Sequence, residues 1–218
     1  MMSLEDSHAT AADISRLAAA APLTAGYRFE LLRRDEIGAV IGVLDAWYRD
    51  VSVGSAACHF DECYYENEVL FEDSPQRDAI VLTLKSDAGL VGMFSCKLDQ
   101  PTRSIYAGLG VAAAEHRGAS IAHAGIVFVE ALTLHLGMGF AYGMATLKHP
   151  YAQLAFERAG WRLVGIAPGY DRELIAPQVV KRVYEAVYAQ VFGDDLLRPL
   201  VHNMTPRTQA LFSSLFAA

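Results

Sequence analysis

Small residues follow an apolar stretch in the middle of the chain and lead into a second apolar stretch with helical spacing. This segment covers residues 106–123 and carries one fixed positive charge, Arg117. The first amides of a helix have no partner within the helix, and the helix dipole adds partial positive charge at that end. Small side chains let an anion approach those amides. We therefore expect a phosphate cradle at residues 117–122, the alternative being that small residues only let this helix pack closely on a sheet.

The spacing of the segment narrows the class of phosphorylated ligand. It has neither the Gly-x-Gly-x-x-Gly pattern of dinucleotide-binding folds nor the Gly-Lys-Ser/Thr of a P-loop. Coenzyme A remains among the common phosphorylated ligands. A hydrolase triad has no support, because no Gly-x-Ser-x-Gly elbow occurs.

Residue types that bind metals gather at residues 58–63, in the order Cys, His, Phe, Asp, Glu, Cys. This spacing fits no familiar zinc frame, and no second pair of cysteines or histidines follows closely. We therefore expect no metal site. The chain has 3 cysteines, Cys58, Cys63 and Cys96, and an odd number without a visible signal peptide indicates reduced thiols in a cytoplasmic protein.

Hydrophobic periodicity predicts an α/β (α+β) fold. Strands are expected at residues 27–32, 79–84, 90–98, 104–111, 140–145 and 161–166, and helices after Asp35 as a cap, at 121–136 and at 150–159. This order predicts a largely antiparallel sheet with one or two parallel crossovers. Residues 50–76, rich in tyrosine and acids, are expected to form a helix with loops at either end.

The chain length favours one main domain, at residues 25–175. Residues 1–24 are expected to form a loosely held tail, and residues 176–218 a helical extension that packs on the domain. Two helical patterns support the extension, at 179–191 and 205–216. The first of them would pack on the domain or on a second subunit, which leaves a homodimer open, or would form a wall of an acceptor pocket.

Composition and charge exclude several partners. The formal net charge is -7, so bulk electrostatics favour neither nucleic acid nor an anionic membrane surface. The most apolar stretch, residues 121–145, contains His123, Glu130 and His135 and is broken at Gly137 and Gly139. A buried helix followed by a buried strand explains this stretch better than a membrane span.

Residues 117–122, Arg-Gly-Ala-Ser-Ile-Ala, resemble the phosphate-binding signature of the GNAT superfamily of acyl-CoA-dependent N-acyltransferases. That signature is Arg or Gln, two residues, Gly, one residue, then Gly or Ala. The first and last positions match, but Ser120 replaces the central glycine, and a positive φ there would be costly for serine. Residues 140–161 also resemble the family's next strand, helix and aromatic residue, with His149 near its usual Asn and Phe156 near its usual Tyr.

The resemblance spans roughly residues 27–167 and implies a GNAT-like mixed, mostly antiparallel sheet flanked by helices. It implies acetyl-CoA or another acyl-CoA as cofactor and direct attack by an amine, from a small molecule or a peptide, on the thioester. Backbone groups of the strand before the signature would hold pantetheine, and the signature amides would hold pyrophosphate. The cofactor-binding residues expected on this basis are Leu109, Gly110, Val111, Arg117, Gly118, Ala119, Ser120, Ile121, Ala122 and His149.

The amine must lose a proton before it attacks, and candidate bases are Asp61, Glu62, Glu66 and Glu115. Each is alternatively a solvated surface carboxylate. The family's thiolate acid, a tyrosine, is Phe156 here, and a phenyl ring cannot donate a proton. Tyr151, Tyr142, Tyr170 or water would substitute. The residues assigned to catalysis are Glu66, Glu115 and Tyr151.

Two rivals to an acetyltransferase stay open at this point. One is a longer-chain acyltransferase, similar to N-acyl amino acid synthases, since the composition of residues 58–71 permits an apolar tunnel. The other is a GNAT-like module that binds acyl-CoA without turnover, which Phe156 and Ser120 motivate.

Overall fold

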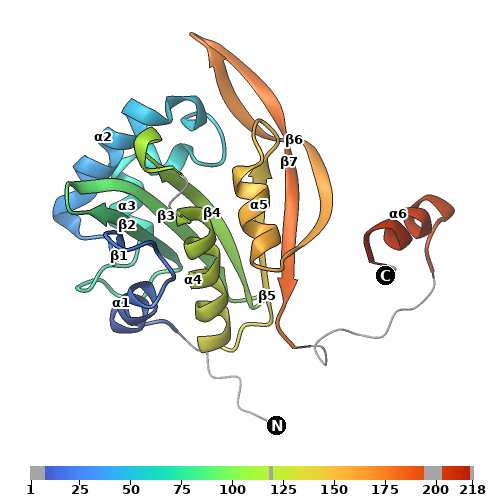
Figure 1. The fold of residues 1–218 in the computed structure, drawn as a ribbon, viewed down its shortest axis with the longest axis horizontal. Helices are drawn as coiled ribbons and strands as arrows, with labels where there is room; N and C mark the ends of the chain where they lie inside the picture. Colours follow the sequence, from blue (N-terminus) through green and yellow to red (C-terminus); the bar gives the residue numbers. More distant parts are fainter. Residues whose placement is uncertain (1–7, 118–119, 194–202, 217–218) are drawn as a thin grey trace.

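A seven-stranded sheet forms the centre of the fold in this computed structural model, which describes residues 8–117, 120–193 and 203–216 (Figure 1). The strand order is β1-β2-β3-β4-β5-β7-β6. The β4–β5 pair is parallel and the other neighbouring pairs are antiparallel, as the sequence predicted. The strands are β1 (Arg28–Leu31), β2 (Ala79–Ser86), β3 (Gly89–Asp99), β4 (Ser104–Ala112), β5 (Phe140–Thr146), β6 (Arg162–Ala176) and β7 (Val179–Val191).

Helices cover both faces of the sheet. On one face α4 (Ile121–His135) and α5 (Tyr151–Arg158) lie side by side, with α1 (Ala11–Ala19) next to α4 (Figure 1). The other face carries α2 (Ile37–Trp47) and α3 (Glu62–Glu68). Short 3-10 helices connect these elements: η1 (Arg34–Glu36), η2 (Arg49–Val51), η3 (Ala57–Phe60) and η4 (Ala114–His116). The last helix, α6 (Pro206–Phe216), has no buried residue.

Alternation along the strands divides the core into two layers. Ile80, Leu82 and Leu84 of β2 pack in the layer under α4, whereas Val81, between two of them, packs in the layer under α2. This alternation is the period of two that strands impose on their side chains. It also decides, for each residue of β4 and β5, on which face of the sheet its side chain lies.

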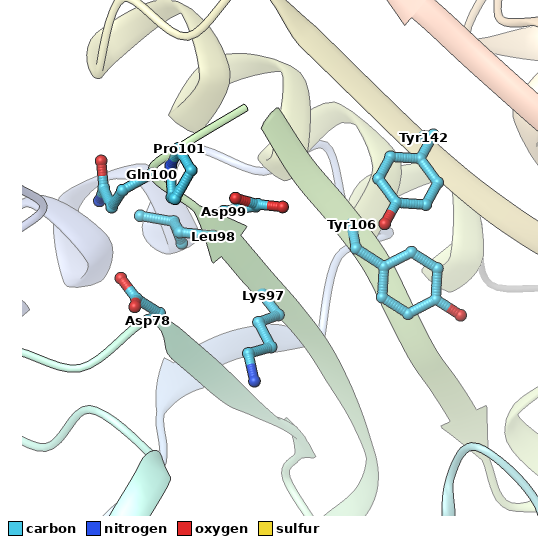
Figure 2. A pocket seen from close by; sticks show the side chains of 8 residues that line it. All are labelled: Asp78, Lys97, Leu98, Asp99, Gln100, Pro101, Tyr106 and Tyr142. Atoms are coloured by element: carbon cyan, nitrogen blue, oxygen red, sulfur yellow. The ribbon is translucent and has the colours of Figure 1, made fainter. Parts of the chain in front are cut away.

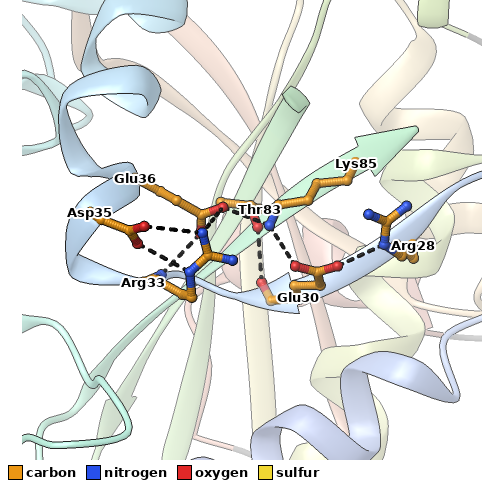
Figure 3. A network of polar contacts seen from close by, with 7 residues as sticks. All are labelled: Arg28, Glu30, Arg33, Asp35, Glu36, Thr83 and Lys85. Carbon is orange, nitrogen blue, oxygen red and sulfur yellow. Dashed lines mark hydrogen bonds and ion pairs between the residues drawn. The ribbon is translucent and has the colours of Figure 1, made fainter. Parts of the chain in front are cut away.

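A network of charged side chains ties the edge of the sheet to the start of α2 (Figure 3). The Lys85 ammonium lies 2.5 Å from a carboxylate oxygen of Glu30 and 2.6 Å from one of Glu36. Lys85 is buried at 9% exposure. A cation this buried needs such partners, because unpaired burial of a charge is costly.

The structure corrects three expectations. Residues 179–191 form a strand, β7, and not a helix, and β7 pairs with β5 and β6, so the boundary expected near residue 175 falls within one hairpin of the sheet. The segment is rich in valine and tyrosine, which favour strands, and the pairing with β5 outweighs its helical periodicity. Residues 11–19 form a capped helix with Ile14 fully buried, so this part of the N-terminal segment is not loosely held. Asp35 lies within η1, and α2 begins without a side-chain cap.

Three predicted parts of the fold are confirmed. The hairpin at residues 79–98, the strand of residues 104–111 and the helix starting at Ile121 are all present. Cys58, Cys63 and Cys96 are free thiols. Within the described part of the chain, no helix has both the length and the hydropathy that a membrane span requires.

Candidate functional site at the fork of strands β4 and β5

Strands β4 and β5 pair along only part of their length and then separate. The parallel register runs from Ser104 opposite Phe140 to Ala107 opposite Gly143. Beyond that point β4 continues to Ala112 and β5 to Thr146 without pairing to each other, while β5 stays paired with β7 along its other side. The sheet therefore contains a fork that begins at Gly143 and opens toward the N-terminal end of α4. Backbone groups along the inner edge of such a fork can bind a ligand.

A β-bulge lies on β4 at the start of the fork. Phe94 pairs with Gly110 and Cys96 with Ala107, so Ser95 faces both Gly108 and Leu109. The Ser95 hydroxyl accepts the Leu109 amide hydrogen at 2.9 Å. A Cβ atom on Gly108 would lie 2.8 Å from that hydroxyl oxygen, which explains the glycine.

Hydrogen-bond alternation decides which predicted pantetheine-binding groups face the fork. The Ala113 amide donates to the Val91 carbonyl of β3 at 2.9 Å. Antiparallel strands alternate, so the backbone polar groups of Val111 also face β3, while those of Gly110 face the open side. The Leu109 amide is already bonded to Ser95. Of residues 109–111, Gly110 is therefore the one whose N–H and C=O point into the fork.

The N-terminal end of α4 closes the wide end of the fork. Its N-cap, Ser120, has φ 57 and ψ 18 and makes no capping hydrogen bond, so no side-chain cap occupies the amides of Ile121 and Ala122. Serine thus adopts the positive φ that we expected to be costly here. Two other predicted cradle residues, Gly118 and Ala119, lie outside the described residues.

Arg117 is connected to the fork through an aromatic ring. Its guanidinium lies over the Tyr48 ring, 5.4 Å from the centroid, and the Tyr48 hydroxyl donates to the Ala112 carbonyl at 2.8 Å. Arg117 itself is exposed. The positive charge that we expected to bind pyrophosphate, Arg117, therefore lies close to the C-terminal end of β4, at the first residue of the expected phosphate cradle.

Phe156 lies at the narrow end of the fork. A Cβ atom added to Gly143 would lie 2.5 Å from the Phe156 Cζ. The ring stacks on Tyr188 at 5.1 Å between centroids and 8° between planes. A buried phenyl ring thus packs against the residue at which the strands separate.

The structure does not bring the three predicted catalytic residues together through any contact. Glu66 is exposed on α3 and Glu115 is exposed on η4. Tyr151 is 67% exposed at the start of α5, and its ring centroid lies 5.0 Å from that of His149. His149, itself exposed, therefore packs on Tyr151.

A buried histidine, which sequence reasoning did not connect with the site, supports the bulge. His59 is 5% exposed, and its Nε2 lies 3.2 Å from the Ser95 hydroxyl. Burial lowers the pKa of His59 to about 4, so the imidazole is neutral at pH 7. In sequence, His59 belonged to a cluster of metal-ligand types, and nothing there indicated that it reaches Ser95 on β3.

A carboxylate on β7 was also missed. Glu185 pairs in register with Thr146 of β5 on one side and with Ala167 of β6 on the other. Burial, followed by the charges of Asp171 and Glu173, raises the pKa of Glu185 to about 7. The expectation of a helix at residues 179–191 hid this placement, because only the strand pairing brings Glu185 beside β5.

A cavity of about 320 Å³ adjoins the narrow end of the fork (Figure 2). Tyr106 and Tyr142 border it from β4 and β5, and their ring centroids are 5.2 Å apart. The other lining residues come from just before β2, the end of β3 and the turn after β3: Asp78, Lys97, Leu98, Asp99, Gln100 and Pro101. The lining of this cavity is therefore mixed, with charged and amide side chains beside aromatic and aliphatic ones.

Several solved structures share this fold. A spermidine/spermine N-acetyltransferase, SpeG from Vibrio cholerae, matches with a TM-score of 0.58 and 13% identity, over 77% of this chain and 95% of that one. The ribosomal-protein-S5-alanine acetyltransferase from Vibrio fischeri matches with a TM-score of 0.59 and 10% identity, over 80% and 97%. RimJ from Mycobacterium smegmatis, in complex with CoA-disulfide, matches with 0.55 and 11%, over 79% and 84%.

No protein-family model matches the chain, and no curated protein matches it in sequence. The structural likeness at these identities establishes the fold. The chain thus has the GNAT fold: a mixed, mostly antiparallel sheet flanked by helices, with the fork between β4 and β5.

Proposed function

We propose that this chain is an N-acyltransferase that moves an acetyl group from acetyl-CoA to a primary amine by direct attack. The observation that carries the proposal is the separation of β4 from β5 after Gly143, with the uncapped N-terminal end of α4 at the wide end. An extended pantetheine arm can pair with Gly110, and α4 amides can receive the pyrophosphate. Amides held in advance near the thioester would stabilise the developing oxyanion.

The proposed cofactor contacts follow the sequence expectation with one refinement. Gly110 supplies the backbone pair that faces the fork, and Arg117 with the amides of Ser120, Ile121 and Ala122 supplies the positive end. Leu109 contributes through the bulge that Ser95 holds. His149, on the far side of the fork beside Tyr151, is proposed to contact the cofactor through its exposed ring.

The acceptor is proposed to be a primary amine of a small molecule or a peptide in the cytoplasm. The structurally similar proteins include enzymes named for spermidine and for a ribosomal protein's alanine, and both acceptors present an amine. Glu66, Glu115 and Tyr151 stay predictions for proton transfer. All three side chains are exposed and so are accessible to a substrate, but their surroundings do not fix where their polar atoms lie relative to the fork.

One observation favours a second candidate, a module that binds acyl-CoA without turnover. Phe156 replaces the phenol that the family resemblance implies for protonating the thiolate, and its ring is buried between Tyr188 and Trp161. Such a module would bind acetyl-CoA as tightly as an enzyme. It would release no free thiol when an amine is added.

Two measurements test the proposal. Isothermal titration with acetyl-CoA is expected to show binding, and Arg117→Ala is expected to weaken it several-fold, because the variant removes a charge beside the diphosphate. The matched control is Arg158→Ala, at the exposed end of α5. Thiol release is then followed with an amine panel. Absence of binding at millimolar acetyl-CoA would reject both candidates, and binding without thiol release would leave only the module.

A further inference from the structure

A carboxylate on β7, Glu185, lies one strand away from the fork, on the face of the sheet opposite α4. Glu185 pairs with Thr146, three residues beyond Gly143, so it stands about 10 Å past the start of the fork at a strand rise of about 3.3 Å per residue. Ala141 and Ala145 pack in the layer under α4, so Thr146 and its partner Glu185 face the other way. Glu185 therefore lies on the face of the sheet opposite α4, whose first amides are the proposed pyrophosphate contacts.

This carboxylate is only partly exposed and is unpaired within the part of the chain that the structure describes. Among the described residues, no hydrogen bond or ion pair reaches its oxygens, although two acidic neighbours are both bound. Asp171 accepts from the amide and hydroxyl of Ser55 at 2.6 and 2.8 Å, and Glu173 contacts the Lys148 ammonium. An unpaired carboxylate in a partly buried position is costly, and an organic ammonium ion would relieve that cost.

On these grounds we propose that Glu185 is the general base that deprotonates the acceptor ammonium, and that the acceptor is an alkylamine in its cationic form. This inference rests on the proposed function. The inference extends the proposed function by naming the general base and by assigning a positive charge to the acceptor. It also gives β7 a chemical role besides its place in the sheet.

The surroundings of Glu185 suit this role. Facing it are Asp171, Glu173 and Tyr170 from β6 and Tyr106 from β4. Tyr142 of β5 neighbours the two tyrosines, and Lys148 and Asp50 lie farther out around Glu173. Burial first, and then the two carboxylates, raises its pKa to about 7. A general base works best when its pKa lies near the working pH.

The step balances without any further reactant. The Glu185 carboxylate takes one proton from the alkylammonium ion, and the nitrogen lone pair forms a bond to the thioester carbonyl carbon. The C–S bond then breaks, and the sulfur leaves with the electron pair. The thiolate takes the second proton from the nitrogen, giving the amide and the free thiol. Glu185 finally returns its proton to water.

The test compares acetyl transfer by wild type, Glu185→Gln and a matched control, Glu72→Gln, an exposed loop residue. Acceptors are spermidine, n-butylamine and a peptide with an N-terminal alanine, assayed by thiol release from pH 5.5 to 9. We expect wild-type kcat/KM to rise with pH and level off above an apparent pKa near 7. The kcat/KM of Glu185→Gln is expected to be lower by about 10²–10⁴-fold, the range for a general base. It should keep rising with pH, because the fraction of free amine keeps growing. Acetyl-CoA affinity by titration should stay within about twofold.

Each contrary result has a distinct meaning. A wild type that binds no acetyl-CoA overturns the proposed function itself. A wild type that binds acetyl-CoA but acetylates none of the amines overturns the base assignment. The same follows if Glu185→Gln keeps the wild-type rate and its kcat/KM still levels off above an apparent pKa near 7. Glu66→Gln and Glu115→Gln, tested alongside, show whether replacing one of those carboxylates removes this pH dependence instead.

Discussion

The Ser95 hydroxyl accepts the amide hydrogen of Leu109 at 2.9 Å, and this bond satisfies an amide of the β4 bulge at the start of the fork. A bulge leaves one strand residue without a ladder partner. Here the Ser95 side chain replaces that partner. His59, from η3 beside α2 and α3, lies 3.2 Å from the same hydroxyl. The shape of the fork therefore depends on a serine and a neutral histidine that need not touch any ligand.

Replacing Ser95 by alanine should destabilise the protein. The variant leaves the Leu109 amide and the His59 Nε2 without their partner, and one buried unsatisfied group costs about 1–3 kcal/mol. Urea unfolding of the full chain measures the loss. Ser86→Ala, at the hairpin between β2 and β3, removes the same atom near solvent and should change stability by about 0.5 kcal/mol or less. Equal losses in the two variants would show that the bulge does not depend on Ser95.

Phe156→Tyr should raise the acetyl-transfer rate while leaving acetyl-CoA affinity nearly unchanged. The Phe156 Cζ lies against Gly143, so a hydroxyl there stands at the start of the fork, where a departing thiolate needs a proton. We expect an increase of about tenfold, below the ~10²–10⁴-fold range of a well-placed proton donor, with some loss of stability from the buried hydroxyl. Phe156→Leu, which adds no donor, is the control. A lower rate in Phe156→Tyr than in Phe156→Leu would contradict this account.

Ser120→Gly should stabilise the protein and tighten acetyl-CoA binding. Serine has φ 57 there, and a left-handed conformation costs a residue with a Cβ about 1–2 kcal/mol. Glycine removes that cost but loses about 0.5–1 kcal/mol of chain entropy, so a net gain of about 0.5–1 kcal/mol is expected. Gln178→Gly, with φ 63 at the turn between β6 and β7, should give a similar gain in urea unfolding without affecting acetyl-CoA titration. Tighter binding in both variants would mean that the effect is not local to the cradle.

Local sequence patterns predicted the parts of the site that depend on neighbours along the chain. The apolar alternation of β4, the small residues after it and the helical spacing from Ile121 all lie within one continuous segment. That segment could be read from periodicity and from helix-end chemistry alone. The fold class followed in the same way, from the order of the elements.

Contacts across the sheet could not be predicted in this way. Glu185 reaches β5 only because β7 inserts between β5 and β6, and its segment also carries valines at helical spacing. His59 reaches Ser95 across 36 positions of the sequence. Strand register and buried pairs depend on the tertiary structure, which outweighs local propensity in both cases.

Lys85→Met should destabilise the protein by about 2–3 kcal/mol at pH 7. It removes the cation that Glu30 and Glu36 share. The figure is below the roughly 3–5 kcal/mol of a fully buried pair because Glu30 is 35% exposed and the two carboxylates keep Arg28 and Arg33 as partners. The exposed Lys181→Met on β7 is the matched control.

The same variant should lose part of the acid sensitivity of the wild type. The hydrogen bond from Lys85 lowers the pKa of Glu30 below its ordinary value of 4.5. A carboxyl group with a lowered folded-state pKa stabilises the fold above its unfolded value, and that contribution disappears as the pH falls through the folded value. Wild type should therefore lose more stability than Lys85→Met between pH 5 and pH 3, as measured by urea unfolding at each pH. Parallel curves for the two proteins would show that the Lys85–Glu30 pair contributes nothing to folding.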